Sequence, residues 1–420
     1  MSRAGSAVLA AVALCLFLGA WALLHHGTLA RAQITDTGVY ARYGDNVAGA
    51  GEVPYRDFHL EYPPGALPVF ILPALGHEGD RLAYDRWFDR LMALCGCLAL
   101  AGVALVLRAL GAGPLRTAGA LLLVAMSPLL LGSVVLTRFD FWPASLAVLA
   151  LAAILHERLV LAALALGAAI AAKLWPFALA PLFVAHIWRT RGARAAALWA
   201  GALVAVDAAI FLPFAVLAPA GLRASFHAQI ARPLQLESLG SAVLIALHHV
   251  AGLHVHVASS FGSQNITGTG AHAAEIVTSA AELTGLVAVW IFYARSQASR
   301  ERLVVLSGAA VAMLLAFGKV FSPQFAIWLV PLVPLVRGRR GAGAAALLVS
   351  VLVLTQLWFP RHYWALANGL APRESWLLLA RDLAVLGLAM LLAWPRLEHE
   401  PLGEGRALLE ALQRVRAQVE

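Results

Sequence analysis

Residues 91–108 read LMALCGCLALAGVALVLR, an apolar run whose only charged residue is the last one, Arg108. Crossing the roughly 30 Å hydrocarbon core of a bilayer takes a helix of about 20 mostly apolar residues. A run of this kind is typical of a transmembrane helix, and similar runs recur along the whole chain. They cover 7–24, 117–136, 141–155, 159–172, 174–188, 196–217, 275–294, 303–318, 323–336, 343–358 and 376–394. The sequence therefore predicts an all-α, polytopic transmembrane helical bundle with about twelve spans.

The composition agrees with a membrane protein and excludes a soluble one. Hydrophobic residues make up 61% of the 420 positions and charged residues only 13%, whereas about a quarter of a soluble domain is charged. The basic pI near 9.9 does not indicate nucleic-acid binding, because the basic residues stand singly or in threes between apolar runs. The three cysteines, Cys15, Cys95 and Cys97, fall inside apolar runs and indicate neither a disulfide framework nor a metal cluster.

Several of the runs differ in length from a standard span. The first run, Ala7 to Leu24, is longer than the core of a signal peptide, so we expect an uncleaved helix, although Ala30-Arg31-Ala32 resembles a cleavage site. The runs at 141–155, 159–172 and 174–188 are short. They are either full spans or broken, re-entrant segments, and the sequence leaves both possibilities open.

Charge in the short connections predicts the orientation. With the N-terminus inside, every short basic connection falls on the inner side, as the positive-inside rule requires. These connections carry Arg108 and Arg116, Arg158, Arg189 to Arg194, Arg295 to Arg302, and Arg337 to Arg340. Two long loops, 30–90 and 218–273, then lie outside. We expect 1–394 to form one catalytic module and 395–420 a cytoplasmic tail, whose apolar residues recur at the spacing of an amphipathic helix.

The first outer loop carries acidic residues suited to acid–base chemistry. Asp36 stands where the first span emerges, and a carboxylate there can accept a proton from an incoming hydroxyl. The alternative for Asp36 is a helix N-cap or a solvated loop residue. Asp57 and Glu61, the latter followed by Tyr62, are candidates for contacts with a sugar or simple anchors of the loop.

Lysine is used very selectively. Of 31 basic residues, only Lys173 and Lys319 are lysine, and both stand at predicted outer ends of spans. An ammonium group at this depth is costly, so such residues are candidates for function, and it suits a phosphate oxygen well. The alternative is snorkelling of the side chain to the membrane surface.

Both lysines begin polar breaks in apolar sequence. The breaks are KLWP at 173–176 and KVFSPQ at 319–324, and a third polar motif, TRFD at 137–140, adds Arg138 and Asp140. Proline after such a break starts a helix, and helix N-termini favour anions. We therefore expect an outward cationic cavity beneath the loop that bears Asp36, suited to a lipid-linked phosphate donor and a hydroxyl acceptor.

The chain resembles the GT-C superfamily of membrane glycosyltransferases, and within it the polyprenol-phosphate-mannose-dependent enzymes of glycosyltransferase family 87. The resemblance rests on the order of several motifs rather than on one of them. These are Asp36, EVPYRDFHLEYPPGA at 52–66, the motifs at 137–140 and 173–176, RPLQLESLG at 232–240 and KVFSPQF at 319–325. It implies a GT-C-like fold, Asp36 as catalytic base, and inverting transfer of a sugar from a polyprenyl phosphate. Neither sugar nor acceptor follows from it, because members of the family differ in both.

The site residues expected on these grounds form two groups. Lys173, Lys319, Arg138 and His227 are expected to bind the donor phosphate, and Asp57, Glu61, Tyr62, Asp140, Gln324, Gln235 and Glu237 the substrates. Four histidines between 248 and 256 suggest a metal site, but the residues between them are apolar, which favours an interfacial helix. No cofactor is predicted, and assistance by a divalent ion stays open.

The sequence thus predicts a glycosyltransferase of the plasma membrane with an outward site, cytoplasmic termini and no nucleic-acid partner. It would move mannose or another hexose from a polyprenyl phosphate to a hydroxyl of an envelope glycolipid or glycan. The main alternative is a secondary transporter or lipid flippase, for which the span count is also common. The unlike halves of the chain do not favour that alternative. A non-catalytic subunit of an envelope assembly is a third possibility.

Overall fold

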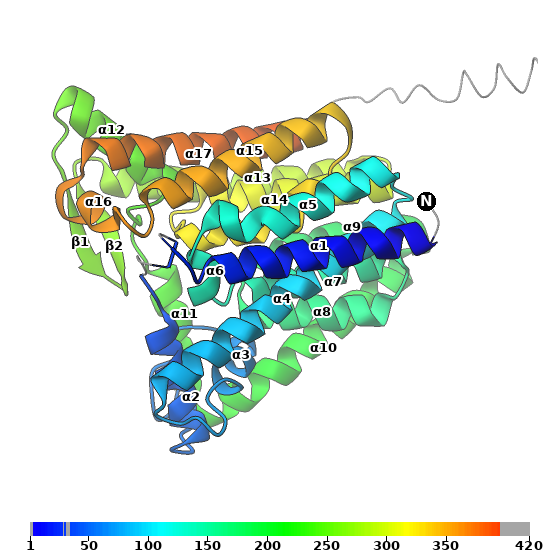
Figure 1. Cartoon of the computed structure of the whole chain (residues 1–420), viewed down its shortest axis with the longest axis horizontal. Helices are drawn as coiled ribbons and strands as arrows, with labels where there is room; N and C mark the ends of the chain where they lie inside the picture. The colour runs from blue at the N-terminus through cyan, green and yellow to red at the C-terminus, as the bar shows by residue number, and fades with distance from the viewer. Residues whose placement is uncertain (1–2, 28, 31–33, 395–420) are drawn as a thin grey trace, which may run out of the picture.

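The computed structural model describes residues 3–27, 29–30 and 34–394 of the chain, and Figure 1 shows its long helices running side by side. Six helices in these described residues are long and apolar enough to cross a membrane. They are α4 (Arg81–Ala109), α5 (Pro114–Leu131), α10 (Ala193–Leu217), α13 (Ala271–Arg295), α15 (Gly338–Trp358) and α17 (Pro372–Ala393). The prediction of an all-α polytopic membrane fold is confirmed, whereas the number of twelve spans stays a prediction.

Further helices complete the bundle between these six. They are α1 (Arg3–Leu23), α7 (Phe141–Leu155), α8 (Leu159–Ala172), α9 (Ala180–Arg191) and α14 (Arg300–Phe317). The short helix α7 packs against both α4 and α8 and is buried along most of its length. Small residues permit this close packing: a Cβ on Gly102 of α4 would lie 2.7 Å from Val148 Cγ1 of α7. By contrast, α10 turns apolar side chains such as Leu198 and Val216 outward, as expected of a helix that faces lipid.

The basic connections meet at one end of the bundle. Arg116 donates to both carboxylate oxygens of Glu301, at 2.7 and 2.9 Å. Arg300 donates to the carbonyl of Ala109, and Arg189 donates to the carbonyl of Ala294. In Figure 1 the start of α1 and the end of α17 lie at one end of the bundle. The connections that were grouped by charge in the sequence are therefore neighbours in space.

The outer segments, defined here as residues 34–80 and 218–270, lie at the other end of the bundle (Figure 1). The first contains α2 (Thr37–Ala48), η1 (Pro64–Ala66) and α3 (Leu67–Ile71). The second contains α11 (Pro219–Ile230), α12 (Leu239–Ala251), β1 (Val255–Ser260) and β2 (Ser263–Gly268). The short α6 (Val134–Thr137) and α16 (Tyr363–Gly369) lie between longer helices in the chain. Helix α4 starts at Arg81, so its charged first turns extend the span predicted at 91–108.

The hairpin of β1 and β2 corrects one expectation. His248 and His249 lie in α12, as expected of a helix, but His256 lies in β1 and His254 just before it. Gly252 ends α12 in the left-handed conformation, with φ of 69°. The alternating residues that follow then pair antiparallel with β2, from Val255 opposite Gly268 to Ser260 opposite Ser263. In the described residues no group of three or more metal-binding side chains comes together.

The polar breaks end helices inside the bundle. Helix α8 stops at Ala172, and the run predicted at 174–188 is η2 (Trp175–Leu179) followed by α9. Helix α14 stops at Phe317, and η3 (Pro323–Leu329) and η4 (Val333–Leu335) replace a regular span. Irregular backbone at such a depth is tolerated where it is buried in protein or lines a cavity. The breaks after α8 and α14 line a cavity, through Lys173 and Lys319. The predicted tail, 395–420, lies outside the described residues.

Candidate active site

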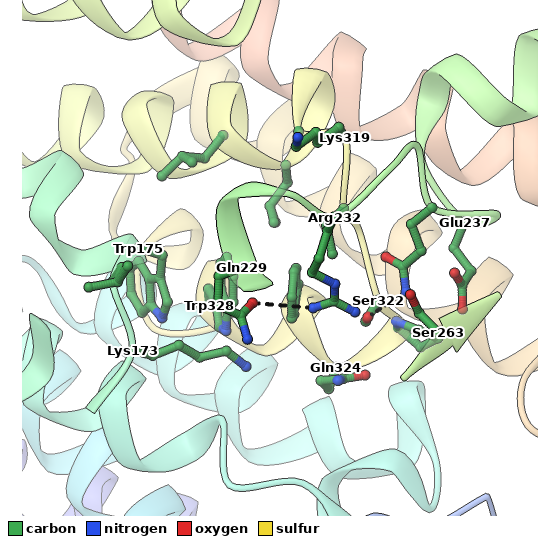
Figure 2. A pocket seen from close by; sticks show the side chains of 18 of the residues that line it. Lys173, Trp175, Gln229, Arg232, Glu237, Ser263, Lys319, Ser322, Gln324 and Trp328 are labelled. Carbon is green, nitrogen blue, oxygen red and sulfur yellow. Dashed lines mark hydrogen bonds between the residues drawn. The ribbon is translucent and has the colours of Figure 1, made fainter. Parts of the chain in front are cut away.

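A cavity of about 700 Å³ lies where α8 and α14 end beneath the outer segments. Figure 2 shows it from close by, with side chains from several elements pointing into one space. Nine of the site residues expected from the sequence line it: Asp36, Glu61, Tyr62, Arg138, Lys173, Gln235, Glu237, Lys319 and Gln324. Residues far apart in the chain are therefore brought to one place.

Asp36 is held by an arginine from inside the bundle. It occupies the N-cap position of α2, but its side chain makes no capping hydrogen bond there. Instead Oδ1 lies 3.1 Å from Nη1 of Arg138, whose side chain is almost completely buried. The hydroxyl of Tyr40 approaches the other oxygen, Oδ2, at 3.4 Å. The carboxylate is thus oriented toward the cavity rather than used to cap the helix.

Lys173 extends from the end of α8 into a cluster of aromatic rings. Its Nζ donates to Oδ1 of Asp140 at 2.7 Å and lies 4.6 Å from the ring centre of Phe325. Trp328 stacks on Phe325 and also donates to Asp140 Oδ1, at 2.6 Å. Asp140 is fully buried behind the lysine. This arrangement differs from snorkelling, because the ammonium group is fixed and faces the cavity.

Lys319 lines the cavity but has two protein partners. Its Nζ donates to the carboxylate of Glu275 at 3.0 Å and to the carbonyl of Ile230 at 2.9 Å. Its own carbonyl accepts a hydrogen bond from the backbone of Gln235 at 2.9 Å. Lys319 therefore joins two outer elements to the end of α14 and keeps one donor for a ligand.

Arg232 is the cation with the loosest attachments. Its Nη1 lies 4.0 Å from the Glu61 carboxylate and donates to Gln229 at 3.5 Å. Its buried Nε has no partner in the described part of the chain. In Figure 2 Arg232 lies between Lys173 on one side and Glu237 on the other. It has donors available near the middle of the cavity.

Three expected residues do not line the cavity. Asp57 is exposed and holds its own loop, accepting from Arg56 and from the backbone of Val53. The adjacent arginine lowers the pKa of Asp57 to about 2. His227 is on an exposed position of α11. Asp140 lies behind Lys173 and acts on the cavity through it.

Burial fixes the protonation state of several outer groups. It raises the pKa of the Tyr40 phenol and of the Tyr62 phenol well above the usual value. Both phenols therefore stay protonated at neutral pH. Burial also raises the pKa of Glu237 to about 7, so this residue is mostly protonated below about pH 7 and mostly ionised above it.

Residues 58–323, well over half of the chain, match the sequence model of glycosyltransferase family 87. The chain belongs to this family. It is therefore a multi-pass membrane protein of a glycosyltransferase family, and the resemblance on which the expected site was based is confirmed at the level of the family. No curated protein matches the chain.

Two solved structures align with most of this chain at low sequence identity. One is the archaeal oligosaccharyltransferase AglB from Archaeoglobus fulgidus, in complex with an inhibitory peptide and a dolichol-phosphate. It aligns over 92% of this chain at 15% identity with a TM-score of 0.46. ArnT from Cupriavidus metallidurans, in the apo state, aligns over 92% at 15% identity with a TM-score of 0.48. The chain spans 56% of the oligosaccharyltransferase and 76% of ArnT.

The cavity of this family 87 glycosyltransferase also contains residues that the sequence did not single out as ligands. Arg232 is the first residue of the motif RPLQLESLG, and this position in the motif is the sequence feature that could have identified it as a site residue. Glu275 does not line the cavity but holds Lys319, from which it is separated by 44 residues, and nothing in the sequence connects the two. Glu282, an acid inside α13, lines the cavity as well.

Proposed function

We propose that this family 87 glycosyltransferase transfers mannose or another hexose from a polyprenyl phosphate to a hydroxyl of an envelope glycolipid or glycan. One observation carries the proposal. Asp36, a carboxylate oriented by Arg138, shares one cavity with three further cations, Lys173, Arg232 and Lys319. A base beside a group of cations suits a reaction in which a hydroxyl attacks and a phosphate leaves.

The reaction is a direct displacement at the anomeric carbon of the sugar. Asp36 takes the proton of the acceptor hydroxyl, and the acceptor oxygen forms the new bond to the anomeric carbon. The bond from that carbon to the phosphate oxygen breaks, and the electron pair leaves with the lipid phosphate. Attack from the face opposite the leaving group inverts the configuration.

The leaving phosphate needs cations with donors that the protein has not already used. Lys173 gives one of its three donors to Asp140, and Lys319 gives two to Glu275 and Ile230. Arg232 has only long contacts to Gln229 and Glu61. Arg232 and Lys173 therefore have the most donors available, and we assign the phosphate chiefly to them. Arg138 serves mainly to hold the base.

The same cavity offers an apolar wall for a lipid chain. Leu286 and Trp290 of α13 and Leu314 of α14 line it, and they belong to helices of the bundle. Phe177, which also lines the cavity, is 56% exposed. An amphiphilic donor could place its phosphate near Lys173 and its polyprenyl chain along this wall. The need for a membrane-bound donor explains why the transferase is a membrane protein.

The positive charge at the end of the bundle away from the cavity supports an outward-facing site. The arginine-rich connections meet at the end of the bundle away from the cavity. If that end is cytoplasmic, as the positive-inside rule predicts, the cavity faces outside and the start of α1 and the end of α17 face the cytoplasm.

The function is tested with the purified protein in detergent or nanodiscs. It is incubated with polyprenyl-phosphate mannose, with other polyprenyl-phosphate hexoses, and separately with nucleotide sugars. Release of polyprenyl phosphate together with a glycosylated acceptor is the expected result. Transfer from a nucleotide sugar alone would contradict the proposed donor. Movement of the lipid across a bilayer with no release of phosphate would favour the flippase alternative.

A further inference from the structure

A short outer stretch, residues 232–237, forms part of the cavity wall and is fixed on two sides. The backbone of Leu236 donates to the carbonyl of Gln264, and Ile266 donates back to Leu234, each at 2.9 Å. The stretch thus runs beside β2 of the hairpin. The hydrogen bond from Gln235 to the Lys319 carbonyl joins its other side to the end of α14. Side chains on this stretch are therefore held rigidly at the cavity.

Two side chains of this stretch keep polar atoms without a protein partner. Gln235 and Glu237 are each only 3% exposed, and both line the cavity. Gln235 donates through Nε2 to Ser322 at 2.9 Å, which leaves its Oε1 as a free acceptor. Among the described residues, no partner is found for Gln235 Oε1 or for Glu237 Oε2. Buried polar atoms are normally paired, so these two indicate a ligand that supplies the missing partners.

Arg381 bonds to the backbone of Glu237 rather than to its carboxyl group. Arg381, fully buried in α17, donates through Nη2 to the backbone carbonyl of Glu237 at 2.5 Å. Its Nε lies 2.7 Å from Asp382, and its guanidinium lies over the ring of Phe321, 3.8 Å from the ring centre. The arginine thus holds the backbone of Glu237 and leaves the carboxyl group to the cavity. A buried carboxyl without an ion pair favours its neutral form.

We propose that Glu237 acts as a neutral carboxylic acid that donates a hydrogen bond to one hydroxyl of a bound sugar ring, while Gln235 accepts one from a second hydroxyl. The inference rests on the proposed transfer of a sugar and extends it to how the sugar is recognised. A pyranose ring presents hydroxyl groups that each donate and accept, which matches one donor beside one acceptor.

The position of the pair agrees with such a ligand. In Figure 2 Glu237 and Ser263 lie at one side of the drawn cavity, and Lys173 and Trp175 lie at the other side with Arg232 between them. A sugar phosphate with its phosphate near Arg232 and Lys173 would extend its ring toward Glu237. The ring of a glycan acceptor approaching from the outer segments could reach the same pair. Both sources present the same hydroxyl chemistry, and the experiment below distinguishes them.

The charges around Glu237 agree with the neutral form. Burial is the main cause that raises its pKa to about 7, and a hydrogen bond from its own backbone N–H and then the nearby arginines oppose that rise. The charged or titratable groups that act on it are Arg381 and Asp382 of α17, Arg232 of its own stretch, Arg138 before α7 and Tyr363 of α16. Because the raised pKa favours the proton, the donor is present below about pH 7 and is lost as the pH rises above it.

The test compares the pH profile of transfer in the wild type with that of Glu237→Gln. Glutamine keeps an N–H donor at every pH but is a weaker donor than an acid. Transfer by Glu237→Gln at about pH 6 is expected to fall by about three- to tenfold and then stay level as the pH rises. Wild-type transfer is expected to decline above about pH 7. Glu78→Gln, an exposed outer-loop change away from the cavity, is the control and should keep the wild-type profile.

Two results would overturn the inference while leaving the proposed function intact. One is an active wild type beside a folded Glu237→Gln that is inactive at every pH, since a hydrogen-bond donor at this position would then not be sufficient. The other is a Glu237→Gln profile that declines with pH as the wild type does. A wild type that transfers no sugar from any polyprenyl phosphate would instead contradict the proposed function itself.

Deoxy analogues identify the ring that Glu237 contacts. For the wild type, removing the recognised hydroxyl should cost at least about tenfold in kcat/KM, because a buried donor is left unpaired. In Glu237→Leu, checked for monodispersity and donor binding, that penalty should disappear. If the penalty disappears with deoxy analogues of the donor, Glu237 contacts the ring of the donor sugar. If it disappears with deoxy analogues of the acceptor, Glu237 contacts the ring of the acceptor. A penalty that persists in both series contradicts the inference.

Discussion

Arg138 holds Asp36 through an ion pair of 3.1 Å between Nη1 and Oδ1, and the two residues come from different parts of the molecule. The guanidinium emerges from the buried connection before α7, and the carboxylate belongs to the first outer segment. The pair therefore fixes the candidate base relative to the helix ends that form the cavity. A charge-assisted hydrogen bond of this kind determines orientation as well as charge.

Arg138→Gln should weaken transfer by releasing Asp36 from its orientation. We expect a loss of roughly 10²-fold in kcat, because small displacements of a reacting group are costly. Donor affinity should change less than in variants of Arg232. The measurement is steady-state transfer together with donor binding for each purified variant. A fall in donor affinity with unchanged kcat would instead assign Arg138 to the phosphate.

Arg232→Gln and Lys173→Ala should each weaken binding of the donor. A hydrogen bond to a charged group contributes about 1.5–3 kcal/mol, which corresponds to roughly 10- to 150-fold in Kd. Lys319→Ala should have a smaller effect, since two of its donors are used within the protein. Arg223→Gln is the matched control, because Arg223 lies on an exposed position of the neighbouring helix α11. Equal donor affinity in all four variants would show that none of these cations binds the phosphate.

Arg381 should contribute both to the folding stability of the protein and to the position of the Glu237 backbone at the cavity. Arg381→Met leaves Asp382 buried without its cation, and breaking such a pair costs about 3–5 kcal/mol of folding stability. The double variant Arg381→Met, Asp382→Leu should recover much of that stability, as apolar replacements of a buried pair often do. Transfer should stay low in the double variant, because the backbone of Glu237 has lost its donor. Recovery of transfer along with thermal stability would contradict this positioning role.

The orientation is tested by labelling single cysteines in a variant that lacks Cys15, Cys95 and Cys97. Cysteines at Ala50 and Ser260, both exposed in the outer segments, should react with an impermeant thiol reagent added to intact cells. A cysteine at Arg339, exposed at the basic end, should react only after the cells are opened. Labelling of position 339 in intact cells would reverse the orientation.

The fold could be predicted to the extent that apolar runs identify helices. Every predicted run coincides with a helix or with the short helical turns of η2, η3 and η4. The hairpin of β1 and β2 was not predicted. Short strands in which polar and apolar residues alternate give a weak sequence signal compared with the long apolar runs of the helices. How far the short helices α7 and α8 cross the membrane could not be predicted either. Helix α8 ends beside Lys173, which lines the cavity, and the cavity is formed by segments far apart in the chain.

The residues of the site could be predicted better than their partners. Lys173 and Lys319 stood out because the chain otherwise uses arginine, and Asp36 because it follows the first span. Their counter-ions, Asp140 for Lys173 and Glu275 for Lys319, depend on contacts between segments that are far apart in the chain. Local sequence patterns do not encode such pairings, so the free donors of each cation become visible only in the structure.

The most direct test of the central claim is the transfer rate of Asp36→Asn with a polyprenyl-phosphate sugar donor. Asparagine nearly preserves the shape of the side chain but cannot accept the proton, and general-base catalysis contributes about 10²–10⁴ in rate. The variant must match the wild type in monodispersity and donor affinity, and Asp57→Asn serves as the control acid outside the cavity. We predict that Asp36→Asn loses at least about 10²-fold in kcat while Asp57→Asn stays close to the wild type. An Asp36→Asn variant that keeps more than about a tenth of the wild-type rate would contradict the account, because the base would then lie elsewhere.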